Sequence, residues 1–527
     1  MKKSRLLLLP ILATLAFTVS CEDGSSEGSS SSSSASETTS SSSNGGDQSS
    51  SSTSEEQPYV PKITEPTTIS IWTTMDDSKQ ELLNSWIEDF KEIEPNVTIN
   101  NVKQSGDYTS LREKIVQGFA ADNYPDITYC YPDHVADYIN YNKALDLTDY
   151  VSDSKYGFTE EEISNDFVEA FWQEGSEYSI PGIYSLPFGK STEAMFYNAE
   201  ALIDLDLSTI DKSINGGNPL NENYLNNLTW EELFNKLCPA IVKYNETVKQ
   251  IIDLSDPYSA IVGYDSDDNF FITLAEQYGY DYTSINQVTG VGSADFNNDE
   301  MKDLMKMFYD AASKKYLITS GSNADGAYTS DLFKVNKTLF GIGSTAGAKH
   351  QIASTDPFPV GVAQIPGAQN GNNRIISQGP SMTILRHDKT SGGVDENRAW
   401  ASFLFYKYIT NTDNGAVFSL NSNYAPVRYS STETEIYQDA LAAANVSETT
   451  DVEVINGLVL KYFNEVLDRF YVSPVFVGSS ACRDQAGSIM TQVMNAGRGK
   501  TQTDETLDSW LDTIFSTAYN EAIKSIK

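Results

Sequence analysis

The segment that decides the fold runs from Ile69 to Tyr131 and opens with Ile69-Ser70-Ile71-Trp72, whose alternation predicts a β-strand. Apolar residues then recur at helical spacing from Leu82 to Phe90, between the stretch Asp76-Asp77-Ser78, which offers an N-cap, and Pro95. The patterns continue, and a strand, a helix and a strand are expected in turn over residues 97–102, 111–119 and 127–131. This succession is typical of a parallel α/β sheet.

The length of the chain predicts more than one structural unit. Residues 61–527 exceed what one hydrophobic core usually serves, so two or three domains or lobes are expected. The composition, 39% hydrophobic and 11% aromatic, is that of a globular chain. Helices are expected over residues 230–237, 270–278, 301–312, 398–409, 454–470, 485–493 and 507–523, with loops over 424–428 and 473–483.

The N-terminus carries the features of a secretory leader followed by a tether. Basic residues precede an apolar run, Leu6 to Phe17, that is too short for a membrane span, so a signal peptide is expected over residues 1–20. Cys21 stands at the expected cleavage point, in a context that resembles a bacterial lipobox and implies a lipid anchor. The alternative is ordinary secretion with an incidental cysteine. The composition of residues 21–60, rich in Ser and Thr, favours a disordered tether.

Charge and motifs exclude several classes of function. The net charge of −37 argues against nucleic-acid binding, which needs clustered Lys and Arg. Cys130, Cys238 and Cys482 cannot all pair and form no C-x-x-C, so neither a disulfide framework nor a zinc site is expected. The acidic run from Asp265 to Asn269 lacks the turn glycine and terminal glutamate of a calcium loop. We therefore expect no metal and no cofactor.

A series of short motifs occurs in a fixed order along the chain. They are Ile69-Ser70-Ile71-Trp72, Ala120 to Ile127, Leu186-Pro187-Phe188, Phe196-Tyr197-Asn198, Gly343 to Gly347, Gln378 to Ser381, and Tyr424 to Arg428. Together they resemble the extracellular solute-binding proteins of ABC importers, in the group of maltose- and glycerol-3-phosphate-binding proteins. The order and spacing of the motifs, and not any single motif, carry the resemblance. It covers nearly all of Thr67 to Lys527.

The resemblance implies an α/β, two-lobed, periplasmic-binding-protein-like fold (type II), with a hinge of several chain crossings and a ligand cleft between the lobes. Ligand contacts to both lobes would favour a closed form, which a transporter can read as loaded. The crossings are expected near Tyr184–Pro187, Thr338–Gly343 and Gln378–Met382. Lobe 1 would comprise residues 61–186 and 341–380, and lobe 2 residues 187–340 and the mostly helical part 381–527.

The glycerol-3-phosphate-binding branch of the family implies five contact residues: Ser191, Ser344, Gly379, Tyr424 and Arg483. Glycines beside Ser344 would let its backbone and hydroxyl approach a ligand closely. The alternatives are loop capping for the two serines, a packed loop aromatic for Tyr424 and a salt bridge for Arg483.

Other candidates follow from residue type and position. Trp72 could stack on the apolar face of a sugar or belong to the core. Tyr131 and Asp133 follow the third strand, at the sheet edge where α/β proteins bind ligands, and Asp133 could accept hydrogen bonds from sugar hydroxyls. Glu193 could do the same or be a solvated acid, and Arg428 could contact a ligand or an acidic neighbour.

The expected function is delivery of a sugar or oligosaccharide to an ABC transporter permease by a protein lipid-anchored at the extracellular face of the membrane. The 30 tyrosines suit stacking on sugars. A glycerol-3-phosphate or glycerophosphodiester ligand, with Arg483 pairing the phosphate, is the alternative within the same fold. A tethered glycoside hydrolase or an adhesin is the alternative of another class. With 73 acidic residues, carboxylate pairs are too abundant to identify a catalytic one, and no enzyme activity is expected.

Overall fold

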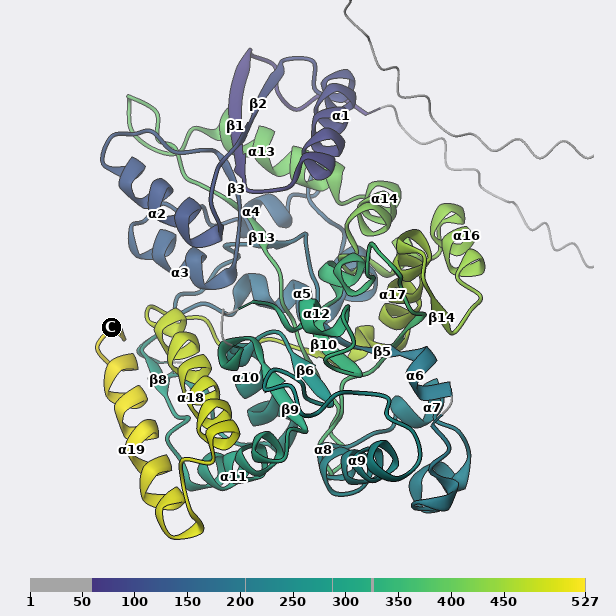
Figure 1. Ribbon diagram of the computed structural model, residues 1–527. Helices are drawn as coiled ribbons and strands as arrows, with labels where there is room; N and C mark the ends of the chain where they lie inside the picture. The colour runs from purple at the N-terminus through teal and green to yellow at the C-terminus, as the bar shows by residue number, and fades with distance from the viewer. Residues whose placement is uncertain (1–58, 204, 287, 324–326, 527) are drawn as a thin grey trace, which may run out of the picture. The chain divides into compact units, whose positions relative to one another are not determined.

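A five-stranded sheet, with the order β2-β1-β3-β13-β4, organises the first part of the fold (Figure 1). Its strands are β1 (Thr67–Thr73), β2 (Val97–Lys103), β3 (Ile127–Cys130), β4 (Leu186–Pro187) and β13 (Ser381–Ile384). β1 pairs in parallel with β2 and β3, so the predicted parallel α/β segment is confirmed. β13 pairs antiparallel with β3 and β4, which makes the sheet mixed. We call this sheet and the helices packed on it lobe 1.

Two of the lobe 1 helices follow the sequence pattern closely. α1 (Asp77–Ile93) buries Leu83, Trp86 and Phe90 on one face, and the carboxylate of Asp76 accepts the Lys79 N–H as its N-cap. α2 (Tyr108–Phe119) lies on the same sheet. Lobe 1 also contains α3 (Pro132–Asn140), the short helices α4 (Thr148–Val151) and α5 (Glu169–Gln173), α13 (Glu396–Ile409) and α14 (Thr412–Ser422).

The structure, a computed structural model, describes residues 59–203, 205–286, 288–323 and 327–526. The expected signal peptide, Cys21 and nearly all of the expected tether therefore lie outside the described residues. Among those that are described, no helix has the length and apolar character required to cross a bilayer.

A six-stranded sheet, with the order β14-β11-β5-β10-β6-β9, forms the centre of lobe 2. β10 pairs antiparallel with β5 and parallel with β6, and β11 pairs antiparallel with β5. The strands are β5 (Glu193–Asn198), β6 (Val262–Tyr264), β9 (Leu317–Thr319), β10 (Phe340–Ser344), β11 (Val360–Ala363) and β14 (Glu448–Thr449).

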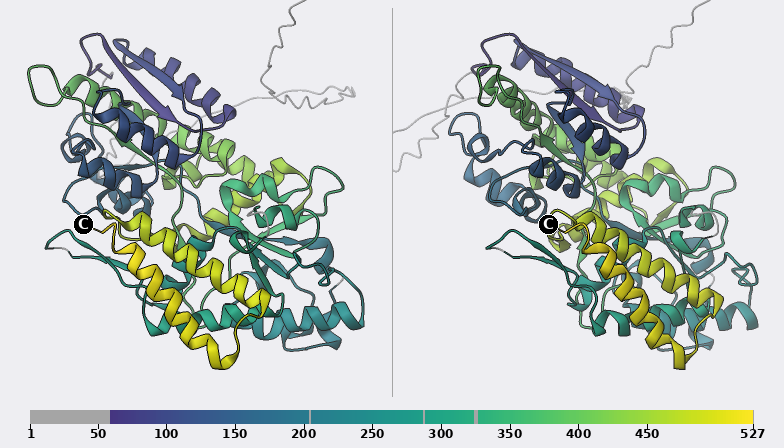
Figure 2. Two further views of the ribbon diagram at one scale, coloured as in Figure 1. Left: turned by 60° about the vertical axis from the view of Figure 1, so that its left-hand side comes forward. Right: turned by 90° about the vertical axis from the view of Figure 1, so that its left-hand side faces the viewer.

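Helices from the middle and the C-terminal end of the chain surround this second sheet (Figures 1 and 2). α18 packs on α10, α11 and α19, so residues far apart in sequence share one core. The helices are α9 (Cys238–Thr247), α10 (Asp267–Tyr278), α11 (Asp299–Ser313), α12 (Thr329–Phe333), α17 (Val452–Val466), α18 (Ser479–Gly499) and α19 (Asp504–Ala522). Two further pairs of short strands are β7 (Thr283–Ile285) with β8 (Gly292–Ala294), and β12 (Ile375–Ile376) with β15 (Phe470–Tyr471).

Three sequence-based boundaries are wrong. Residues 341–380 were expected in lobe 1, but β10 and β11 pair with β5 in the second sheet. Residues 381–527 were expected wholly in lobe 2, but β13 pairs with β3, and α13 packs on the first sheet. The expected crossing at Thr338–Gly343 does not exist, because β9 and β10 belong to the same sheet.

A segment expected as a loop, 473–483, also becomes helical at Ser479, after Gly478 turns the chain with φ of 109°.

Three crossings join the lobes. One follows α14 and leads to β14. The other two run side by side. One connects β4 to β5 and the other lies just before β13, close to the expected crossing at Gln378–Met382. Ser191 and Gln378 exchange two backbone hydrogen bonds, of 3.0 and 2.9 Å, and Gly189 N–H donates to Pro380 O. Gly379 has φ of 89°, and a Cβ there would lie 2.0 Å from the Gly189 carbonyl oxygen. This close approach requires glycine. We call residues 188–192 and 377–380 the hinge ribbon.

Candidate functional site

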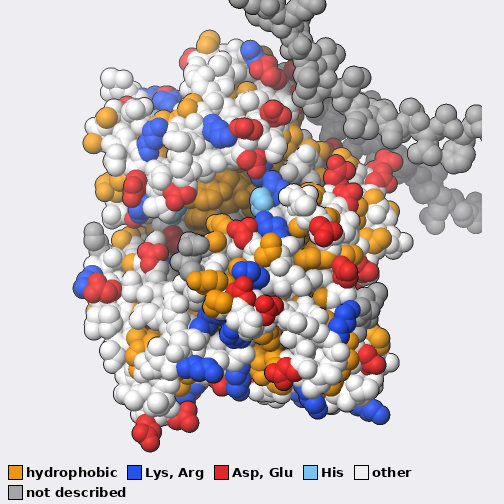
Figure 3. Space-filling model, viewed as in Figure 1, with side chains coloured by type: hydrophobic (Ala, Val, Ile, Leu, Met, Phe, Trp, Pro, Cys, Tyr) orange, Lys and Arg blue, Asp and Glu red, His pale blue; other side chains and the backbone are white. Residues whose placement is uncertain are grey.

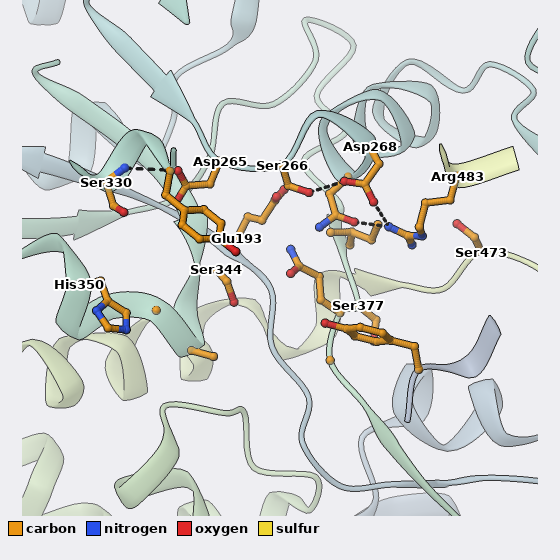
Figure 4. Close-up of a pocket in the computed structure, with 18 of the residues that line it drawn as sticks. Glu193, Asp265, Ser266, Asp268, Ser330, Ser344, His350, Ser377, Ser473 and Arg483 are labelled. Atoms are coloured by element: carbon orange, nitrogen blue, oxygen red, sulfur yellow. Dashed lines mark hydrogen bonds and ion pairs between the residues drawn. The ribbon is translucent and has the colours of Figure 1, made fainter. Parts of the chain in front are cut away.

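A cavity of about 700 Å³ lies between the two lobes, and the face shown in Figure 3 is hollowed there. Its position follows from the topology. The carboxyl ends of β3, β6 and β10 and the start of β5 all point to this region, which is where α/β sheets bind ligands. Lobe 1 contributes Tyr131, Asp133 and Glu174 to the wall. Lobe 2 contributes Glu193, Asp265, Asp268, Ser344 and Arg483 (Figure 4). Gly379 of the hinge ribbon forms part of the wall between the lobes.

Six of the ten candidate ligand-binding residues from the sequence line this cavity. They are Tyr131, Asp133, Glu193, Ser344, Gly379 and Arg483. Ser191 is buried beside it, with its hydroxyl 3.5 Å from that of Ser344. Trp72, Tyr424 and Arg428 do not line it.

The three residues outside the cavity make other contacts. Trp72 packs against a lobe 1 core cluster, and the Lys114 ammonium lies 5.2 Å from its ring centroid. Tyr424 stacks on Phe418, with ring centroids 5.7 Å apart. Arg428 is buried and pairs with Asp166 at 2.8 Å, which is the salt-bridge alternative considered for it.

Arg483 is already paired with acidic residues inside the cavity. Its Nη1 lies 2.9 Å from Asp268 Oδ2, and its Nε lies 3.6 Å from Asp133 Oδ2. Burial pushes the pKa of Asp268 upward, but the Arg483 guanidinium outweighs this effect and holds that pKa below its usual value. The positive charge of Arg483 is therefore shared between two carboxylates of the wall.

The charged residues of the wall are mostly acidic. Six carboxyl groups line the cavity: Asp133, Glu174, Glu193, Asp265, Asp268 and Asp331. The Lys and Arg residues in the same wall are Lys334 and Arg483, and Lys334 pairs with Asp331 at 2.8 Å. Glu174 is paired with Lys190, so the acidic excess comes from Asp265 and from the two aspartates that share Arg483. The resulting net negative charge repels an anionic ligand.

Glu193 is the most buried acid of the wall. It lies at the start of β5, opposite Ser344 of β10, and only 1% of its surface is exposed. Its Oε2 accepts a hydrogen bond from the Tyr264 hydroxyl, whereas its Oε1 has no partner among the described residues. Burial raises the pKa of Glu193 to about 8, although the Tyr264 hydrogen bond acts in the opposite direction.

Asp265 lies at the end of β6, on the same side of the cavity as Ser330 (Figure 4). Its Oδ1 accepts from the Thr329 N–H at 2.5 Å and from the Thr329 hydroxyl at 2.7 Å. Burial raises the pKa of Asp265, while the Thr329 bonds oppose the shift. The carboxyl group is thereby held in one orientation at the start of α12.

A buried ion pair supports the wall at the hinge ribbon. Lys190 contacts Glu174, and both side chains are almost completely buried. The Ser381 hydroxyl donates to Glu174 Oε2 at 2.9 Å, and the Lys190 ammonium lies 3.4 Å from Gly379 O. The pair therefore ties both strands of the ribbon to lobe 1. Sequence reasoning missed both residues because nothing in their local pattern distinguishes them from other acids and lysines.

Asp265 and Asp268 were noticed in the sequence only as part of a rejected calcium loop, and the structure places both in the cavity wall. Within the described part of the chain, no group of three His, Cys, Asp or Glu residues could hold a metal ion. Cys130, Cys238 and Cys482 are buried and unpaired in that part.

Aromatic side chains lie at the rim of the cavity. Tyr131 is 38% exposed, and its ring lies 4.6 Å from that of Tyr108, which fixes its orientation. Tyr328 is 66% exposed and lines the lobe 2 side. Such rings present flat apolar faces beside polar groups, which suits a ligand with both kinds of surface.

The model of the bacterial extracellular solute-binding protein family matches residues 85–445, and the chain belongs to this family. The resemblance stated from the sequence motifs is thereby confirmed. No curated relative matches the sequence.

Solved structures share the two-lobed fold across most of this chain. The cyclic alpha-maltosyl-1,6-maltose binding protein from Arthrobacter globiformis is 15% identical with a TM-score of 0.61, over 87% of this chain and 99% of that one. The sugar-binding protein MalE from Xanthomonas citri is 16% identical with a TM-score of 0.60, over 87% and 98%. UgpB from Mycobacterium tuberculosis, solved with glycerophosphocholine, is 15% identical with a TM-score of 0.59, over 87% and 99%. The periplasmic-binding-protein-like fold is confirmed, and these neighbours are binding proteins.

Proposed function

We propose that this protein is the receptor of an ABC importer and binds a neutral sugar or oligosaccharide in the cavity between its lobes. The observation that carries the choice of ligand is the charge of the wall. Asp133 and Asp268 share Arg483, and Asp265 has no cationic partner among the described residues, so the wall keeps a net negative charge even with Glu193 neutral. A neutral polyhydroxylated ligand can hydrogen-bond to these oxygens and stack on Tyr131 and Tyr328, whereas a phosphate would meet net repulsion.

The two-lobed fold supports a mechanism of ligand-coupled closure. The cavity wall combines Asp133 of lobe 1 with Arg483 and Glu193 of lobe 2, so a ligand that contacts both sides favours the closed form. The hinge ribbon supplies two of the three crossings between the lobes, and such short segments can absorb the change in angle. The closed, loaded form would then dock on the permease. Small-angle scattering with and without ligand measures this closure.

We further propose that Cys21 carries a lipid anchor and that the Ser-rich segment after it tethers the protein to the outer face of the membrane. The support is the sequence alone, namely the basic start, the apolar run and the cysteine at the expected cleavage point. Intact-mass measurement of wild-type protein should show an acyl addition, and Cys21→Ala should release the protein into the medium. Wild type that is membrane-bound without an acyl group would contradict the anchor.

A thermal-shift screen with sugars and glycerol phosphates tests the ligand, because a saturating ligand stabilises the folded protein by mass action. We expect at least one neutral sugar to raise the midpoint of unfolding and glycerol-3-phosphate to leave it unchanged. A response to glycerol-3-phosphate that is lost in Arg483→Ala, with no response to any sugar, would reverse the choice of ligand and leave the family unchanged.

A further inference from the structure

In the cavity wall, one carboxyl oxygen of Glu193 lacks a hydrogen-bond partner among the described residues. Glu193 has this oxygen, Oε1, in a buried position. Its other oxygen, Oε2, already receives the Tyr264 hydroxyl hydrogen. A buried acceptor without a donor is costly, so the state of this oxygen requires an explanation.

Burial and like charge around Glu193 outweigh the groups that favour its ionised form, which are the Tyr264 hydroxyl and Arg483. Tyr264 of β6, Tyr462 of α17 and Tyr471 of β15 surround it, and the Tyr462 hydroxyl donates to its main-chain oxygen at 2.8 Å. Asp265 and Asp268 add like charge. Arg483 is the cation among the groups that influence Glu193, and it is paired with Asp268.

A neutral carboxylic acid reduces this cost, because an unpartnered neutral group is less costly to bury than an unpartnered charged oxygen. Because Tyr264 donates to Oε2, the acid proton resides on Oε1, and the Oε1–H group is a donor without an acceptor in the described residues, on a side chain that lines the cavity. Burial as the main cause, reinforced by Asp268 and Asp265, raises the pKa of Glu193 to about 8, which agrees with a protonated group at pH 7.

We propose that Glu193 is a neutral hydrogen-bond donor in the ligand-free protein at pH 7, and that it donates from Oε1 to an oxygen acceptor of the ligand. It is then a specificity-determining residue that accepts hydroxyl, ring or carbonyl oxygens and loses affinity in alkaline solution. The ionised alternative would accept from sugar hydroxyls or bind a cation, and it predicts the opposite dependence on pH. Only the ligand part of this inference rests on the proposed function.

The protonation state is tested first without any ligand. Protein with 13C-labelled glutamate carboxyl groups is titrated by NMR, and Glu193→Gln identifies the signal that disappears. We expect this signal to titrate near pH 8. Titration at the ordinary glutamate range of about pH 4–5 would overturn the proposal whatever the ligand is.

Binding is then measured by calorimetry with maltotriose as the probe, at pH 7 and pH 9. Because only the neutral form is competent, wild-type affinity should fall about tenfold between these values. Glu193→Gln keeps a donor and cannot ionise, so its affinity at the two pH values should be equal, and Glu193→Ala should bind more weakly at both. Wild-type affinity that rises with pH would overturn the donor role. If maltotriose binds to no variant, the choice of sugar fails, while the NMR titration still decides the state of Glu193.

Discussion

Arg483 on α18 and Asp133 on α3 lie next to each other in the cavity wall, with Nε of the arginine 3.6 Å from Oδ2 of the aspartate. The two helices belong to different lobes, and the Ser479 hydroxyl at the start of α18 also donates to Asp133, at 2.9 Å. The arginine that could attract a phosphate is therefore part of a contact between the lobes. This arrangement connects the acidic character of the cavity to the way in which its two walls meet.

Arg483→Ala should lower the free energy of unfolding at pH 7 by roughly 1–3 kcal/mol, because Asp268 loses its charged partner in a partly buried position. The folded-state pKa of Asp268 is depressed, so its stabilising contribution is present above the unfolded pKa and is lost as pH falls through the folded pKa. The difference between wild type and variant should accordingly shrink in acid. Urea denaturation measures it, and adding Asp268→Asn to the variant should recover part of the loss. A difference that stays constant down to pH 3 would contradict this account.

Glu193→Gln should stabilise the ligand-free protein at neutral pH. The folded-state pKa of about 8 exceeds the usual 4.5, so folded wild type holds a proton that the unfolded chain releases, and its stability falls as pH rises between these values. Glutamine avoids this loss, and the gain should be on the order of 3 kcal/mol at pH 7 and close to zero at pH 4. Urea denaturation at both values checks it. Equal gains at pH 4 and pH 7 would show that the effect does not come from ionisation.

Gly379→Ala should lower the free energy of unfolding by more than the left-handed backbone conformation at this position would cost by itself. Gly379 and Gly371 have nearly equal φ values, 89° and 88°, but the added Cβ meets the Gly189 oxygen in the first case and open space in the second. Gly371→Ala should therefore cost about 1–2 kcal/mol for the left-handed conformation, and Gly379→Ala distinctly more. Comparison of the two unfolding curves isolates the clash. Equal losses of stability in the two variants would mean that the two strands of the hinge ribbon can move apart without cost.

Lys190→Met should leave Glu174 buried without its counter-charge and cost about 3–5 kcal/mol. The double variant Lys190→Met/Glu174→Gln should recover much of this loss. Lys314 pairs with Asp310 at the surface, where both side chains are at least half exposed, and Lys314→Met should cost less than about 1 kcal/mol. If both lysine variants lose the same amount, the pair at the hinge ribbon has no special role in stability.

The sequence predicted lobe 1 well where strands and helices alternate locally. β1, α1 and β2 could be read from periodicity because each element buries one face and neighbours pair along the chain. Lobe 2 could not be read in this way, since β5 pairs with β10 and β11 across more than a hundred residues. A local pattern of apolar residues predicts whether a segment is a helix or a strand, but not which strand it pairs with. Residues 341–380 were therefore assigned to the wrong lobe.

The residues of the candidate site also differ in whether the local sequence could predict them. Tyr131 and Asp133 were predictable because they follow a strand at the binding edge of the sheet. Glu174 and Asp268 were not, because they reach the cavity only through long-range packing and resemble many other acids in the sequence. For Arg428 the charge alone did not distinguish a ligand contact from the buried salt bridge with Asp166.

Binding at the cavity between the lobes is tested most directly by filling that cavity. Gly347 lines it, and no atom lies within 4 Å of the position of an added Cβ, so a large side chain can enter without strain at that atom. Calorimetric titration should use the sugar selected by the thermal-shift screen, with wild type, Gly347→Ala and Gly347→Trp. We predict saturable binding to wild type and to the alanine variant, and no measurable binding to the folded tryptophan variant. Sugar binding that persists unchanged in Gly347→Trp would contradict this account.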